Sequence, residues 1–109
     1  MGLSPEGRSP SGGQNQLLRT IKVYFVYAIK STINSDLYIG YTDSIDKRVK
    51  RHNDGFVKST KFGKPWELVY YEFYKSKKDA TKRERQLKQS YFKKELKERI
   101  IHSLEDASE

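Results

Sequence analysis

Cysteine is absent from this chain, and so is any long run of apolar residues. Without cysteine the chain forms no disulfide and no thiolate metal site, which is typical of a protein in a reducing compartment. A membrane span would need about 18 consecutive apolar residues. A secretory signal would need a basic stretch followed by an apolar core. Because neither is present, we expect a cytoplasmic protein with no membrane partner.

Acidic residues are the minority charge, with 14 Asp and Glu against 22 Lys and Arg and a net charge of +8. This excess favours a polyanionic partner, most simply nucleic acid. An anionic membrane is disfavoured, because no helical segment combines a broad apolar face with a basic one. Apolar residues are 35% of the 109, and eight Tyr, five Phe and one Trp are present. These numbers predict one small domain with a modest, aromatic-rich core.

Glycine and proline are sparse outside the beginning of the chain. Residues 1–20 hold four of the seven glycines and two of the three prolines, and this composition predicts a disordered lead without an assigned function. The folded domain is expected over 21–101. Residues 102–109 are expected to form a flexible acidic tail.

Between these ends the pattern of apolar and turn-forming residues predicts the order β, β, α, β, α, α. The expected strands cover 22–30, 37–41 and 66–74. A helix is expected to follow residues 42–44 and to end near Asn53, before the helix stop Gly55. Further helices are expected from Ser76 and over 91–101, the latter as a continuation or a separate helix, and the basic segment 56–65 is expected to be a loop. The fold class is therefore α+β, with a small, largely antiparallel sheet covered by helices.

The first two strands form a β-hairpin around the turn residues 34–36. Side chains alternate between the faces of a strand, so a connection with an even number of residues puts Tyr27, Tyr38 and Gly40 on one face. We expect that face to turn toward the helix that carries Glu84. Taken alone, the two tyrosines are more simply explained as aromatic packing on a sheet. The position of Tyr41, at the end of its strand, allows either role.

Three polar residues of the helices could act together. Arg48 and His52 are four residues apart and share one helix face, where they could clamp a phosphate or simply be solvated. Glu84 lies four residues after Ala80 and three before Leu87, on or beside the stripe that faces the sheet. A carboxylate there needs a cation or hydrogen-bond donors, and spacing alone favours a salt bridge with Arg48 or a lysine over a metal ion.

These residues together resemble one known family. Tyr27, the run 38–41 (Tyr-Ile-Gly-Tyr), Arg48, 52–53 (His-Asn) and 82–84 (Lys-Arg-Glu) occur in the order and near the spacing of a GIY-YIG nuclease domain. The likeness is to small single-domain bacterial members related to the nuclease module of the excision-repair C subunit. It covers about residues 21–101.

The resemblance implies a three-stranded antiparallel sheet flanked by helices. It also implies hydrolysis of DNA phosphodiester bonds, in DNA repair or processing, with one Mg²⁺ or Mn²⁺ ion. By position, the catalytic residues and the metal ligand would be Tyr27, Tyr38, Tyr41, Arg48, His52 and Glu84, and Gly40 would be the motif glycine. The nucleic-acid contacts are expected at Lys47, Arg51, Lys58, Lys61, Lys64, Lys82 and Arg83.

Two features depart from the family pattern. The first motif reads Phe25-Val26-Tyr27 and lacks the Gly-Ile of the family name, and either Gln86 or Gln89 would serve for a later polar residue. The substrate could be duplex, branched or single-stranded DNA, with RNA and a protein partner left open. The alternative function is a non-catalytic or partner-activated nucleic-acid binding module with the same fold.

Overall fold

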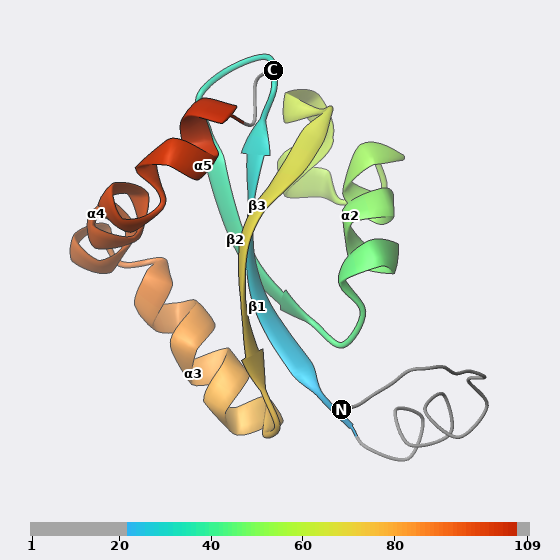
Figure 1. Cartoon of the computed structure of the whole chain (residues 1–109). Helices are drawn as coiled ribbons and strands as arrows, with labels where there is room; N and C mark the ends of the chain where they lie inside the picture. Colours follow the sequence, from blue (N-terminus) through green and yellow to red (C-terminus); the bar gives the residue numbers. More distant parts are fainter. Residues whose placement is uncertain (1–21, 107–109) are drawn as a thin grey trace, which may run out of the picture.

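A computed structural model describes residues 22–106 of the chain. A three-stranded antiparallel sheet lies between helix α2 on one face and helices α3, α4 and α5 on the other (Figure 1). The elements are β1 (Tyr24–Ser31), β2 (Leu37–Thr42), α2 (Ile45–Asn53), η1 (Lys58–Gly63), β3 (Trp66–Tyr74), α3 (Lys77–Leu87), α4 (Ser90–Arg99) and α5 (Ile101–Asp106). The α+β class is confirmed. The predicted lead, 1–20, lies outside the described residues.

Strand β1 is the centre of the sheet, whose strand order is β2-β1-β3. Both of its faces are apolar, which is what a strand covered on both sides requires. Lys30 and Leu37 are the last paired residues of the hairpin, so the connection over residues 31–36 has an even number of residues. Tyr27 pairs with Gly40 and Ile29 with Tyr38. The prediction that Tyr27, Tyr38 and Gly40 share a face is confirmed.

The two faces of the sheet have separate cores. On the α2 side, Tyr27, Ile29 and Trp66 are buried together, with Tyr38 and Val49 packed against them. On the other side, the alternate residues of the same strands pack against α3 and α4. These are Val26, Ala28, Leu37, Ile39, Ala80, Leu87, Leu96 and Ile100. The expectation that the tyrosine face turns toward the Glu84 helix is therefore wrong: α2 covers that face, and α3 packs on the opposite one.

Two segments are more ordered than the sequence suggested. The basic segment 56–65 contains a 3-10 helix, η1, and it folds because Thr60 and Gly63 are buried against the rest of the domain. Residues 102–106, expected in a flexible tail, belong to α5, which packs against the core through Leu104. The acidic composition of this segment predicted flexibility, and the prediction did not take account of the packing of Leu104. Residues 107–109 lie outside the described part.

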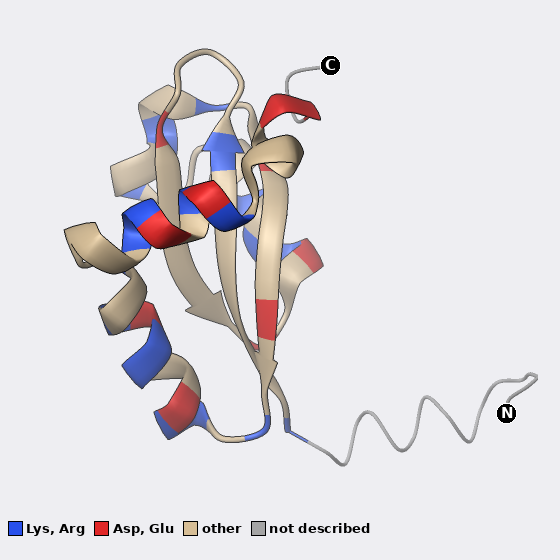
Figure 2. Ribbon diagram, turned by 60° about the vertical axis from the view of Figure 1, so that its left-hand side comes forward, with Lys and Arg blue, Asp and Glu red and all other residues tan. Residues whose placement is uncertain are grey.

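Charge is carried mainly by the helices. Basic and acidic residues alternate along α3 and α4, whereas the strands are almost free of charge (Figure 2). Within residues 22–106, none of the helices has the length and apolar character that a bilayer crossing requires.

Candidate active site

The site is built around the side chain of Tyr27 on the central strand. Its ring is buried, and it lies against the backbone of the neighbouring strand at Gly40. A Cβ atom at position 40 would stand 2.5 Å from the Tyr27 hydroxyl oxygen. Gly40 is therefore needed so that the Tyr27 ring can approach the backbone of β2 closely.

Helix α2 brings two side chains to the Tyr27 hydroxyl from consecutive turns. His52 Nε2 lies 2.7 Å from the Tyr27 hydroxyl oxygen, and Arg48 Nε donates to that oxygen at 3.3 Å. Their spacing of four residues places both on the face of α2 that meets the sheet. The hydroxyl thus has a neutral partner on one side and a cation on the other.

Behind His52 lies Thr60, a residue of the basic segment 56–65 to which sequence analysis assigned no role in the site. The Thr60 hydroxyl is buried, lies 2.7 Å from His52 Nδ1, and donates to the Val57 carbonyl at 3.3 Å. Because Thr60 donates to a carbonyl, its oxygen accepts the proton of Nδ1, and Nε2 accepts that of the Tyr27 hydroxyl. The sequence signal for Thr60 was only a hydroxyl among lysines, eight residues after His52.

Burial sets the protonation of this group at neutral pH. Desolvation raises the pKa of Tyr27 to about 12, against the lowering effect of the hydrogen bond and charge of Arg48. Desolvation, helped by the charges of Arg48 and Arg51, lowers the pKa of His52 to about 4. Tyr27 and His52 are therefore both neutral at pH 7, and Arg48 carries the positive charge.

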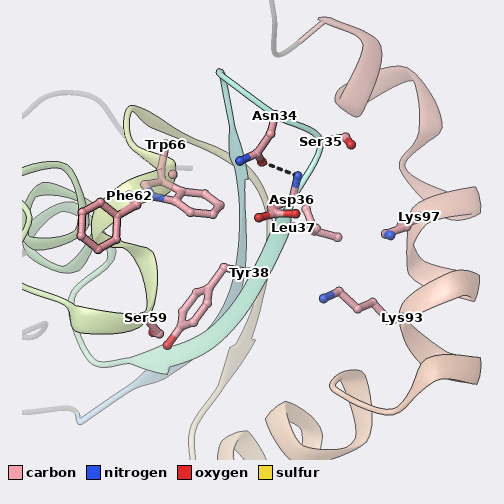
Figure 3. Close-up of a pocket in the computed structure, with 11 residues that line it drawn as sticks. Asn34, Ser35, Asp36, Leu37, Tyr38, Ser59, Phe62, Trp66, Lys93 and Lys97 are labelled. Atoms are coloured by element: carbon pink, nitrogen blue, oxygen red, sulfur yellow. Dashed lines mark hydrogen bonds between the residues drawn. The ribbon is translucent and has the colours of Figure 1, made fainter.

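The second tyrosine is more open than the first. Tyr38 is half-buried and its ring meets that of His52 edge-on, with 5.0 Å between centroids. It also lines a pocket beside the hairpin (Figure 3). Arg48 is close enough that Tyr38 helps to raise its pKa, after the larger effect of Tyr27. Tyr41 points to the opposite face, where it packs against the α3 side core, so the structure does not bring it to this group.

Glu84 lies on α3 and is mostly shielded from solvent. Its carboxylate is 17% exposed and forms an ion pair with Lys88, with Oε2 and Nζ 3.0 Å apart. This is the lysine salt bridge that spacing favoured. Its charge also contributes to raising the pKa of Tyr27, after burial and the nearer tyrosine. Glu84 therefore belongs to the electrostatic surroundings of the site although its helix covers the other face.

The described residues contain no group of three or more His, Cys, Asp and Glu side chains that could cage a metal ion. Glu84 alone supplies a hard, partly desolvated oxygen donor near the tyrosines. That donor set fits a cation such as Mg²⁺, which takes one or two carboxylates and completes its shell with water and substrate phosphate. It does not fit an ion held entirely by protein ligands.

The expected nucleic-acid contacts divide into two groups. Six have exposed side chains: Lys47, Arg51, Lys58, Lys61, Lys64 and Lys82. Arg83 instead pairs with Glu72 of β3, with 2.9 Å between Nε and Oε1, and donates to Gln86. Arg83 is thus engaged within the protein, and so is Gln86.

The chain is similar in sequence to proteins of a known family. A family model described as the GIY-YIG catalytic domain matches residues 23–97. The chain belongs to the GIY-YIG catalytic domain family. This makes it a member of a nuclease family, whose substrates are nucleic acids and whose members generally use a divalent metal ion.

Small relatives match about two thirds of the chain. A UPF0213 protein of Staphylococcus aureus (strain Mu3 / ATCC 700698) is 41% identical over 75 residues, which cover 68% of this chain and 90% of the relative. A UPF0213 protein of Staphylococcus saprophyticus is 40% identical over 75 residues, with the same coverage. No solved structure gave a significant match. The GIY-YIG region coincides with the sheet, α2, α3 and most of α4.

Proposed function

We propose that this chain is an endonuclease that hydrolyses phosphodiester bonds of DNA with the help of one divalent cation. The observation that carries the proposal is the cluster of Tyr27, Arg48 and His52 around one hydroxyl, next to the more open Tyr38. A packing role for the tyrosines would require neither the buried histidine nor the arginine. We further propose a role in DNA repair or processing with low sequence specificity, because exposed lysines read phosphates and not bases.

The half-buried Tyr38 is the better candidate to orient the attacking water, because Tyr27 is almost fully buried. Arg48 would neutralise the charge that develops on the phosphate oxygens. Tyr27 and His52 would hold Arg48 in place, since the Tyr27 hydroxyl accepts its Nε proton and donates its own to His52. Preorganised charge of this kind accelerates phosphoryl transfer without forming a covalent intermediate.

The cation would be held by Glu84, with Mg²⁺ and Mn²⁺ both suited to a carboxylate donor. When bound, it would supply a positive charge to polarise the phosphate. Glu84 must first leave Lys88, whose side chain is 51% exposed, so that water screens its charge. The ion pair is therefore a weak competitor for the carboxylate.

The decisive test is a cleavage assay with supercoiled plasmid, branched DNA, single-stranded DNA and RNA, with Mg²⁺ or Mn²⁺ and with EDTA. We expect metal-dependent nicking of at least one DNA substrate. Glu84→Gln and Arg48→Ala should each lower the rate by about 100-fold or more, since each removes a charge that acts on the phosphate. Circular dichroism would establish that the variants are folded.

Glu95→Gln is the matched control for Glu84→Gln. Glu95 also forms an i,i+4 ion pair, with 2.8 Å between its Oε2 and Arg99 Nη2, and its loss should leave cleavage unchanged. Metal-dependent nicking that survives Glu84→Gln would rule out the proposed role of Glu84. Tight binding with no cleavage of any substrate would favour the second candidate, a non-catalytic or partner-activated binding module. The ion pair that occupies Glu84 is the observation that favours this alternative.

A further inference from the structure

A polar pocket of about 510 Å³ is lined by the hairpin, the η1 segment, Trp66 and helix α4. Residues 34–38 of the hairpin and Ser59 and Phe62 of η1 form one side of it. Lys93 and Lys97 form the other, and Figure 3 shows both side chains pointing from their helix toward the hairpin. Tyr38 thus borders both the pocket and the candidate active site.

The two lysines differ from three basic residues of the helices that have a carboxylate partner on their own helix. Lys50, Lys88 and Arg99 each pair with a carboxylate one turn away, at 2.6, 3.0 and 2.8 Å. Within residues 22–106, neither Lys93 nor Lys97 forms an ion pair. No residue three or four positions from either one is acidic, because these positions hold Gln, Ser, Lys, Leu and Ile. Sequence and structure therefore leave Lys93 and Lys97 without the carboxylate partner that Lys50, Lys88 and Arg99 have.

The arrangement has an electrostatic cost. Lys93 is half-buried, and desolvation lowers its pKa, with the neighbouring charge of Lys97 acting in the same direction. Asp36, in the opposite wall, offsets part of this effect without coming within ion-pair distance. Two ammonium groups that face one pocket repel each other, and an anion placed between them and the hairpin would relieve that repulsion.

The opposite wall suits an anion that also needs hydrogen-bond donors. Ser35 and Ser59 offer hydroxyl groups, and the side-chain oxygen of Asn34 already accepts from the Asp36 amide, which leaves its NH₂ group to donate. The carboxylate of Asp36 is the one group there that an anion would avoid. A phosphodiester strand combines regularly spaced charge with acceptor oxygens, and it would reach the pocket by passing Tyr38.

We propose that this pocket binds two successive backbone phosphates of the nucleic-acid strand being cleaved, one on Lys93 and one on Lys97. The pocket then sets the path of the strand along the β2 edge, past Tyr38. The proposal rests on the proposed function in one respect, that the ligand is a nucleic acid. It adds α4 to the binding surface, where sequence analysis had considered only α2, the η1 segment and α3.

The test compares a Lys93→Gln/Lys97→Gln double variant with wild type for binding of a short fluorescein-labelled DNA duplex and of the matching single strand. Anisotropy is measured in EDTA, so cleavage does not interfere, over a series of salt concentrations. The slope of log K against log salt reports the phosphates neutralised, about 0.7 each for single strands and 0.9 for duplex. The double variant should lose about 1.4 to 1.8 from this slope.

Lys50→Gln/Arg99→Gln is the matched control, because it removes the same charge from residues that already have carboxylate partners. Its slope should change by less than half as much. A Lys93/Lys97 variant that behaves like this control would overturn the proposal, as would a wild-type chain that binds neither DNA. A loss confined to strands with a 5′-phosphate would overturn the assignment to backbone phosphates in favour of a terminal one.

These outcomes separate the pocket from the nuclease activity. If the wild-type chain cleaves DNA and the double variant binds like the control, the proposed role of the pocket is wrong and the catalytic proposal stands. If the double variant shows the expected slope change but the wild-type chain cleaves no substrate, the proposed role of the pocket stands and the catalytic proposal is wrong.

Discussion

At the scale of single residues, the chemistry depends on the side chains that contact the Tyr27 hydroxyl. It lies 2.7 Å from His52 Nε2 and 3.3 Å from Arg48 Nε, and the Thr60 hydroxyl fixes the tautomer of His52 from behind. Replacing any one of them would leave a buried polar group unsatisfied, at about 1–3 kcal/mol. The group is therefore both a structural network and the support for Arg48.

His52 makes folding stability depend on pH. Its pKa falls from 6.5 to about 4 on folding. Between these two pH values, His52 is therefore protonated in the unfolded chain and neutral in the folded chain. Stability is then fully present above about pH 6.5 and falls as the pH is lowered, with about 2 kcal/mol lost at pH 5. Urea unfolding at pH 7, 6 and 5 measures this loss.

His52→Gln should flatten that pH dependence, while His102→Gln, which changes an exposed histidine, should leave it intact. Glu72 has a lowered pKa, against its own desolvation, because Arg83, Tyr70 and Tyr74 donate to it. Its contribution is lost only as the pH falls through the range below 4.5, so measurements above about pH 5 keep the two groups apart. An unchanged slope in His52→Gln would contradict the assignment.

At the scale of elements, the β1–β2 pairing places Tyr27 directly opposite Gly40. The register, and not the glycine's flexibility, creates the requirement, because the Tyr27 ring occupies the space of a side chain. Helix α2 then closes over this pair. On the opposite face, the ion pair between Arg83 and Glu72 joins α3 to β3.

Gly40→Ala should destabilise the fold by about 2 kcal/mol, within the range for overpacked sites, and should lower cleavage more than stability alone explains. The added Cβ would push the Tyr27 hydroxyl from its partners. Chemical denaturation and cleavage rates measure the two effects. Leu104→Ala, which weakens packing on the opposite face, is the control, and equal cleavage in two equally destabilised variants would argue against a local effect at Tyr27.

At the scale of the whole molecule, the sheet separates a polar site on the α2 side from an apolar core on the other. Helix α4 serves both: Leu96 is fully buried in that core, and Lys93 and Lys97 face the pocket. The net charge of +8 acts over all of this surface, and makes DNA affinity dependent on salt.

Leu96→Ala should lower the free energy of unfolding by about 2–4 kcal/mol, the usual cost of a buried Leu→Ala change. Because the cavity forms on the face away from Tyr27, cleavage by the folded fraction should stay within about twofold of wild type. Urea denaturation gives the first quantity, and rates measured well below the melting temperature give the second. A large loss of activity in a fully folded variant would mean that the two faces are coupled.

The order of elements, the strand Trp66–Tyr74 and the shared face of Tyr27, Tyr38 and Gly40 could all be derived from the sequence. Local alternation, turn residues and an even hairpin connection determine these features. The family likeness is equally local, since it depends on motif residues at set spacings.

Only the tertiary structure decided which helix covers which face and which polar groups meet. The expected approach of the Glu84 helix to the tyrosines was wrong, because the side on which a helix packs depends on chain connections and on which apolar stripe fits each face. The roles of Thr60, Arg83 and the pair Lys93 and Lys97 could be seen only in the structure, for the same reason. The partners of Thr60 and Arg83, and the pocket that Lys93 and Lys97 share with the hairpin, depend on contacts between elements that lie apart in the sequence.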